Sequence, residues 1–173
     1  MKKIKLAIVG SAGRMGQQII KEIKNFPNLE LVAAIENKNS NSIGKRIEKL
    51  EITNDKKVAF KKADLIIDFS LPLSTLETLK YAQMLKKKLV IGTTGFNNSQ
   101  VKKIKTASKK ISIVFAPNMS IGINLLIEIV KKTSNILFSD NTSVEILDIH
   151  HKHKKDAPSG TALALGSAVA SGK

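Results

Sequence analysis

A glycine turn close to the N-terminus constrains this chain more than any other feature, since Gly10, Gly13 and Gly16 recur at intervals of three residues. The apolar run 4–9 ends at the first glycine and is typical of a buried parallel strand. Residues 14–24 follow with a helical period, whose apolar face comprises Met15, Ile19, Ile20 and Ile23. A strand, a glycine turn and an amphipathic helix in this order predict the first βα unit of an α/β sheet.

Each glycine of this turn has a physical role in holding a dinucleotide. The first permits the tight turn, the second lets the backbone approach a pyrophosphate, and the third lets the helix pack closely on the sheet. The free N–H groups and positive dipole at the helix N-terminus favour phosphate. Glu36 follows about 20 residues later at the end of a second predicted strand, where an acid accepts ribose hydroxyls. An ordinary βα turn with an exposed Glu is the alternative. The cofactor contacts predicted here are Gly10, Ser11, Ala12, Gly13, Arg14, Met15 and Glu36.

The residues after Glu36 bear on the choice between NADH and NADPH. A carboxylate at this point disfavours a 2′-phosphate, and the next residue is Asn37 rather than an arginine that would offset the charge. Lys38 is the neighbouring cation that would admit NADPH. We therefore expect NADH to be favoured over NADPH, and we expect no metal cofactor.

The remainder of the first 119 residues alternates between apolar strands and helical segments. Predicted strands cover 29–35, 58–60, 65–69, 89–91 and 111–115. Predicted helices cover 73–86 and 98–109, whereas the polar stretch 37–57 has only a weak helical signal. This alternation predicts a Rossmann-type doubly wound parallel sheet, in which loops after the strands line the ligand crevice. Besides residues 68–70, the loops expected to form the nicotinamide wall contain Gly92, Thr93, Thr94, Ala116, Pro117, Asn118 and Met119.

The alternation of short strands and helices ends near Met119 and Ser120, where we place a domain boundary. Residues 1–119 form the predicted dinucleotide-binding domain, and residues 120–173 the N-terminal part of an α+β substrate-binding and oligomerisation domain. Within this part the pattern predicts a long apolar helix, a strand and a short helix, at 120–138, 142–149 and 161–170. The strand has no obvious antiparallel partner, so we expect an incomplete domain, as in a fragment or a truncated reading frame.

All three histidines lie within one polar loop before the last helix, as His150, His151 and His153. A histidine can donate a proton near neutral pH, and Lys154 adds a second donor and positive charge for an anionic substrate. A metal site and a basic loop that contacts phosphates are the alternatives to a catalytic loop. The absence of cysteine and the scarcity of acidic residues weigh against metal.

The last helix has its own predicted role at its N-terminus. Ser159 is placed to cap it, and free N–H groups at Gly160 and Thr161 would bind a carboxylate.

The run from His150 to Ala162 resembles the signature of the 4-hydroxy-tetrahydrodipicolinate reductase family. The glycine turn, Glu36, residues 92–96 and residues 116–120 match that family in the same order. The resemblance implies hydride transfer from NADH or NADPH to a small cyclic, unsaturated dicarboxylate, in lysine and diaminopimelate biosynthesis. It implies that His150 donates or accepts a proton and that Lys154 donates one. The substrate contacts that it implies are His151, Gly160 and Thr161. For full-length members it implies a homotetramer.

The formal net charge of +15 motivates a competing hypothesis, a nucleic-acid-binding protein. All but two of the 29 basic residues are lysines, and they are scattered in pairs and triplets along the chain. With six Phe, one Tyr and no Trp, a base-stacking platform is not expected. We therefore expect no nucleic-acid or membrane partner, and a cytoplasmic location. Two further hypotheses are a different Rossmann-type nicotinamide enzyme and a cofactor-binding fragment with little turnover.

Overall fold

The computed structural model describes residues 2–116, 118–137, 143–150 and 158–172 of the chain. The chain forms two compact units, Met1–Ala116 (unit 1) and Pro117–Lys173 (unit 2). None of the described helices is long and apolar enough to cross a membrane.

Unit 1 is built on a seven-stranded sheet in the order β3-β4-β2-β1-β5-β6-β7. The strands are β1 (Ile4–Val9), β2 (Leu29–Ile35), β3 (Arg46–Ile47), β4 (Leu50–Thr53), β5 (Leu65–Asp68), β6 (Lys88–Ile91) and β7 (Ile113–Phe115). Only the β3–β4 pair is antiparallel. The order proceeds from β1 through β2 to one edge and through β5 to the other, which confirms the predicted doubly wound sheet.

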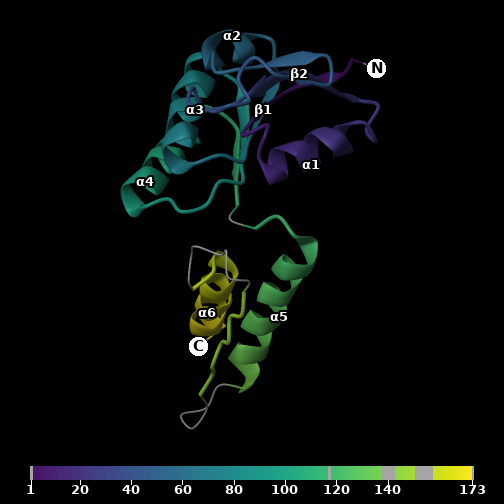
Figure 1. Ribbon diagram of the computed structural model, residues 1–173. Coiled ribbons are helices and arrows are strands. Elements are labelled where there is room, and N and C mark those ends of the chain that lie inside the picture. The colour runs from purple at the N-terminus through teal and green to yellow at the C-terminus, as the bar shows by residue number, and fades with distance from the viewer. Residues whose placement is uncertain (1, 117, 138–142, 151–157, 173) are drawn as a thin grey trace. The chain divides into compact units, whose positions relative to one another are not determined.

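The helices of unit 1 cover the two faces of the sheet unequally (Figure 1). They are α1 (Arg14–Ile23), α2 (Lys56–Lys61), α3 (Pro72–Met84) and α4 (Asn98–Ala107). On one face Leu6 and Ile8 of β1 pack with Ile20 and Ile23 of α1. On the other face a larger core joins the alternate β1 residues to α2, α3 and α4. Met15 was expected on the buried face of α1 but is 51 % exposed, because it lies in the first turn.

One sequence-based expectation in this unit is wrong. The apolar run Val58–Phe60 lies in helix α2 and not in a strand. The Asp55 side chain caps this helix by accepting the Val58 N–H at 2.9 Å, and Phe60 is fully buried. So short an apolar run is equally compatible with a buried helix and a buried strand. The polar stretch 37–57, whose sequence carries only a weak helical signal, contains β3 and β4 and ends in the first residues of α2.

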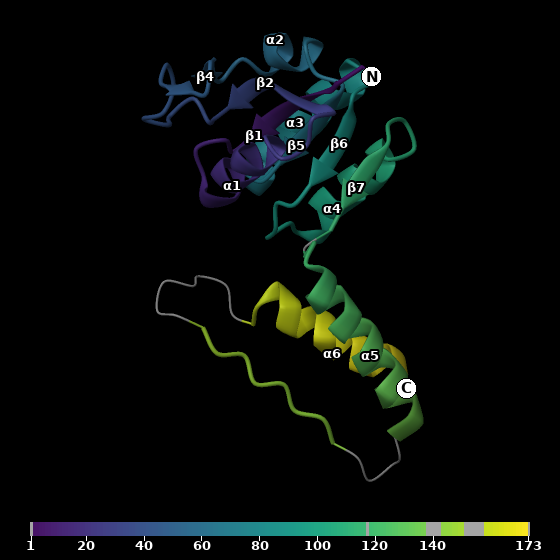
Figure 2. The same cartoon turned by 90° about the vertical axis from the view of Figure 1, so that its right-hand side faces the viewer.

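Unit 2 contains two described helices, α5 (Ile121–Leu137) and α6 (Gly160–Gly172), which lie side by side (Figure 2). They approach closely at Gly172, where an added Cβ would lie 2.6 Å from the Lys131 carbonyl oxygen. The strand expected at 142–149 is wrong for its described residues, 143–149, which form no ladder. Alternation alone does not make a strand when no neighbouring strand supplies backbone hydrogen bonds.

Gly16→Ala should lower the free energy of unfolding by about 1–3 kcal/mol, because overpacking forces the backbone apart. The new methyl group would overlap the Gly10 carbonyl oxygen and push α1 away from the sheet. Urea unfolding followed by circular dichroism measures the change. Gly13→Ala is the matched control, since its Cβ would lie 3.2 Å from the same oxygen at an ordinary φ of −71°. Equal stability of the two variants would contradict the prediction.

Candidate functional site

Five parallel strands of unit 1 end at the same level of the sheet. Val9 pairs with both Ile35 and Asp68, Asp68 pairs with Ile91, and Ile91 pairs with Phe115. The next residue after each strand therefore lies along one edge, and these residues are Gly10, Glu36, Phe69, Gly92 and Ala116. The register thus brings predicted cofactor residues from four separate loops to one edge of the sheet.

The glycine turn presents backbone rather than side chains to this edge. Gly10 has φ +79°, and an added Cβ would overlap the Phe69 carbonyl oxygen. Ser11 is fully buried, and its hydroxyl donates to the Ile35 carbonyl oxygen at 3.2 Å. The N–H groups of Gly10 and Ser11 donate to the same oxygen. A ligand contact with Ser11 would therefore not involve its hydroxyl, which faces the interior.

The N-terminus of α1 is open to an anion. Its N-cap residue, Gly13, supplies no side-chain cap, and the first turn has no acidic residue. Gly13, Arg14 and Met15 are all exposed. Uncapped N–H groups and the positive end of the helix dipole favour a negatively charged group at this point.

Glu36 stands directly beside the glycine turn. Its Oε1 accepts the Ala12 N–H at 2.7 Å, and its Oε2 accepts the Asn37 N–H at 3.3 Å. A carboxylate has about four lone-pair sites, so acceptor capacity is left for hydroxyl groups. A hollow of about 380 Å³ lies here, and its lining includes Gly10, Ala12, Gly13, Glu36, Asn37, Phe69 and Ser70.

The loop after β6 has one buried and one exposed threonine. Thr93 is 3 % exposed, and its hydroxyl is hydrogen-bonded to the Thr75 hydroxyl at 2.9 Å. It also accepts the Ser70 N–H at 3.0 Å. Thr94 is exposed. Of these two predicted cofactor residues, Thr94 has the side chain free to meet a ligand, whereas the Thr93 hydroxyl is engaged within the protein.

In unit 2, Asn118 connects two of the predicted site segments. Its Nδ2 donates to the Thr161 hydroxyl at 3.4 Å, and its Oδ1 accepts the Ser120 N–H at 2.8 Å. Asn124 of α5, which the sequence reasoning missed, donates to the carbonyl oxygens of Asn118 and Ser120. Met119 is 42 % exposed, and Pro117 lies outside the described residues.

Asp148 organises the start of the predicted catalytic loop, although the sequence reasoning did not select it. His150 Nε2 lies 2.6 Å from Asp148 Oδ1. Asp148 also accepts the Ser159 N–H at 2.7 Å and the Ser159 hydroxyl at 3.1 Å. The backbone N–H of Ser159, then its hydroxyl and His150, hold the pKa of the Asp148 carboxyl below its ordinary range. The signal in the sequence was an acid two positions before a histidine.

Ser159 caps helix α6, as its position in the sequence predicts. Its hydroxyl accepts the Ala162 N–H at 3.1 Å. Within the described part of the chain, no hydrogen bond engages the N–H groups of Gly160 or Thr161, so both remain available to an anion. The predicted residues His151 and Lys154 lie outside the described residues. No cluster of three metal-ligating side chains occurs among the described residues, which do not include 151–157.

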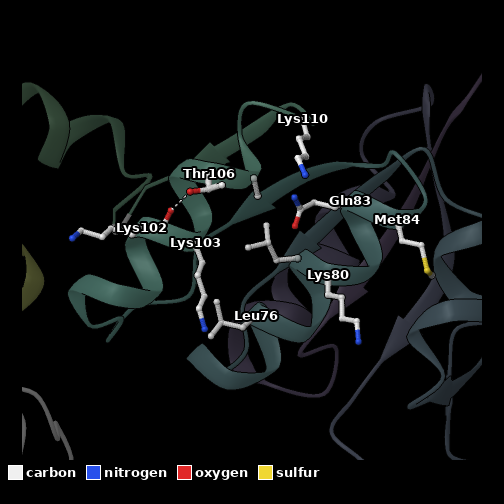
Figure 3. Close-up of a pocket in the computed structure, with 10 residues that line it drawn as sticks. Leu76, Lys80, Gln83, Met84, Lys102, Lys103, Thr106 and Lys110 are labelled. Carbon is white, nitrogen blue, oxygen red and sulfur yellow. Dashed lines mark hydrogen bonds between the residues drawn. The ribbon is translucent and has the colours of Figure 1, made fainter.

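A second hollow of about 730 Å³ lies between α3 and α4 and contains none of the predicted site residues. Figure 3 shows lysines along both helices around it. Leucine side chains form part of its lining, at Leu76 and Leu79. Size alone therefore does not locate the functional site, whereas backbone donors and a carboxylate converge in the crevice at the strand ends.

Comparison with known proteins relates both units to one family. The family model described as dihydrodipicolinate reductase, N-terminus, matches residues 4–119. The model described as dihydrodipicolinate reductase, C-terminus, matches residues 122–173.

Individual relatives agree with these matches. The 4-hydroxy-tetrahydrodipicolinate reductase of Pelagibacter ubique is 51 % identical over all of this chain and 66 % of its own length. That of Buchnera aphidicola subsp. Acyrthosiphon pisum is 43 % identical over 97 % of this chain and 65 % of its own. A solved structure of dipicolinate-bound dihydrodipicolinate reductase from Paenisporosarcina sp. TG-14 aligns with a TM-score of 0.78 and 29 % identity. It covers 97 % of this chain and 66 % of that one. The chain thus spans just under two thirds of the length of these relatives.

Asp148→Asn should lower the melting temperature of unit 2 at neutral pH, because the amide replaces a carboxylate that accepts the Ser159 N–H. The folded-state pKa of Asp148 lies below its ordinary value of 3.8, so its stabilisation is present above that value. It is lost as the pH falls through the folded-state pKa, and the two proteins should converge there. Circular dichroism melts across pH measure this, with exposed Glu145→Gln as control. A difference that persists unchanged in acid would contradict the prediction.

Proposed function

Because the chain belongs to the dihydrodipicolinate reductase family, we propose that it reduces 4-hydroxy-tetrahydrodipicolinate with a nicotinamide dinucleotide. Hydride addition, uptake of one proton and loss of the 4-hydroxyl group as water give tetrahydrodipicolinate, in lysine and diaminopimelate biosynthesis. The observation that carries the proposal is the convergence of the glycine turn and Glu36 in one crevice of unit 1. The Asp148–His150–Ser159 cluster in unit 2 supports the part of the proposal that concerns substrate binding and proton donation.

The residues of unit 1 fit a dinucleotide. The uncapped α1 N-terminus would bind the pyrophosphate, and the lack of a Cβ at Gly10 and Gly16 permits the close packing that forms this turn. Glu36 would accept ribose hydroxyls with the lone pairs that Ala12 and Asn37 leave free. When bound, the nicotinamide supplies the hydride. Thr94, Asn118 and Met119 complete the proposed cofactor contacts together with the backbone of Gly92, Thr93, Ala116 and Pro117.

The residues of unit 2 would bind the dicarboxylate and supply the proton. A substrate carboxylate fits the free N–H groups of Gly160 and Thr161 at the start of α6. Asp148 holds Nε2 of His150, which leaves Nδ1 as the ring nitrogen available for proton exchange. We assign proton donation to His150 and Lys154 and a further substrate contact to His151. Hydride addition makes the ring anionic, and a positioned donor quenches that charge.

NADH is the proposed preferred cofactor, because Glu36 would repel a 2′-phosphate. Lys56 lines a neighbouring hollow with Glu36 and Lys38, but its ammonium is already engaged. It lies 2.7 Å from Glu77 Oε2 and donates to the Ser74 carbonyl oxygen at 2.9 Å. Lys38 is therefore the exposed lysine of that hollow which could accommodate NADPH.

The proposal extends to assembly and location. The family resemblance implies a homotetramer for full-length members. Light scattering measures the molar mass in solution and therefore the number of subunits. We also propose a cytoplasmic location for the protein.

Glu36→Gln should weaken NADH binding by about tenfold and narrow its advantage over NADPH, because it removes a charged acceptor of ribose hydroxyls. Fluorescence titration with both nucleotides measures the change. Glu30→Gln, an exposed acid on the strand that precedes Glu36, is the matched control and should bind like the unaltered chain. Tighter binding of NADPH than NADH by the unaltered chain would overturn the preference.

His150→Gln and Lys154→Ala should each reduce turnover by roughly 100-fold while leaving the NADH dissociation constant unchanged, since general acid–base catalysis contributes about that factor. A coupled assay that generates the substrate and follows nicotinamide oxidation measures turnover. Lys102→Ala is the control for loss of positive charge, because Lys102 lines the α3–α4 hollow and is not among the proposed catalytic residues. Near-normal rates in both variants would overturn the catalytic assignment. NADH binding without turnover in the unaltered chain would favour a cofactor-binding role alone.

A further inference from the structure

Asp68 ends strand β5 and is fully buried, at 0 % exposure. Its Oδ1 accepts the Ser70 hydroxyl at 2.6 Å and the Ser70 N–H at 3.1 Å. The Thr93 hydroxyl lies 3.3 Å from the same oxygen. One carboxylate oxygen therefore gathers groups from the loops that follow β5 and β6.

The same cluster extends to helix α3. The buried Thr75 hydroxyl lies 2.9 Å from that of Thr93, and the Ser70 N–H is shared between Thr93 and Asp68. Ser70 lines the crevice beside the glycine turn, whereas Asp68 and Thr93 lie beneath it. The cluster thus connects the interior of the sheet to the wall that a nicotinamide dinucleotide would contact.

The position of Asp68 is costly for the fold. Burial raises the pKa of its carboxyl, and the Ser70 hydroxyl, which donates to Oδ1, offsets this only in part. Among the described residues, Asp68 Oδ2 and Thr78 Oγ1 are buried side-chain atoms without a hydrogen-bond partner. A buried unsatisfied polar atom costs about 1–3 kcal/mol. An asparagine would accept at one atom and donate at the other, so packing does not require the acid.

We propose that Asp68 is a positioning residue, which holds Ser70 and the Gly92–Thr94 loop in the geometry that binds the cofactor. This inference rests on the proposed nicotinamide function. Asp68 Oδ1 accepts hydrogen bonds from both loops and thereby holds them together. Loops without such a shared hydrogen-bond partner are the most mobile parts of an α/β domain. Phe69 adds a steric contribution, since its ring packs so closely on Gly92 that an added Cβ would overlap it.

The test compares Asp68→Ala and Asp68→Asn by fluorescence titration with NADH. Asp68→Ala should raise the dissociation constant about tenfold, because both loops lose their shared acceptor. Asp68→Asn should stay within about threefold of the unaltered chain, because its amide oxygen still accepts from Ser70. It should also melt at a higher temperature at neutral pH, since it removes a buried acid whose ionisation is penalised.

Thr78→Val is the matched control, because it removes a buried hydroxyl of the same neighbourhood that makes no bond to Ser70 or Thr93. It should change the melting temperature but not the NADH dissociation constant. Where Asp68→Ala does not fold, Thr93→Val replaces it and should weaken NADH binding several-fold. Unchanged NADH affinity in a folded Asp68→Ala or Thr93→Val variant would overturn the positioning role.

Amide hydrogen exchange of the cofactor-free protein separates this inference from the proposed function. Asp68→Ala should accelerate exchange at Ser70 and Thr93, whereas Thr78→Val should not. Unchanged exchange in Asp68→Ala would show that Asp68 does not hold the two loops together. If the unaltered chain bound neither NADH nor NADPH, the proposed function would fail and the positioning role with it.

Discussion

The register of the parallel strands is the constraint on which the rest of unit 1 depends. Because Val9 lies opposite both Ile35 and Asp68, the glycine turn and Glu36 emerge side by side at one edge. A slip of one residue would turn every side chain of a strand to the other face of the sheet. The Glu36 carboxylate would then leave the crevice, and the core on each face would lose its apolar contacts.

Three carboxylates use the same interaction to hold loops in place. Glu36 accepts an N–H from the glycine turn, Asp68 one from the residue two positions later, and Asp148 one from Ser159 at the start of α6. A carboxyl group can accept several N–H and O–H groups at once, so a single acid can fix a loop that packing leaves free. In unit 2 this interaction also places His150 beside the capped helix.

The sequence predicted the elements with strong periodicity and failed where the local signal was ambiguous. The glycine turn, β1 and α1 could be identified because each position has its own steric requirement. Val58–Phe60 could not, since a run of three apolar residues has no measurable period. Asp148 was missed because its role arises from contact with Ser159, 11 residues away. Asn124 was missed because its bonds to Asn118 and Ser120 depend on how the chain turns into α5.

The sequence by itself determined the alternation of strands and helices, the dinucleotide turn with Glu36, and the loop that begins at His150. These features are local, since spacing and residue type along the chain are enough to define them. Only the tertiary structure decided which polar groups form hydrogen bonds within the protein and which are free to bind a ligand. Asp68 and Thr93 look like crevice residues in the sequence, yet both are buried and hold other groups. Burial and hydrogen bonding depend on the register of neighbouring strands, which no single segment encodes.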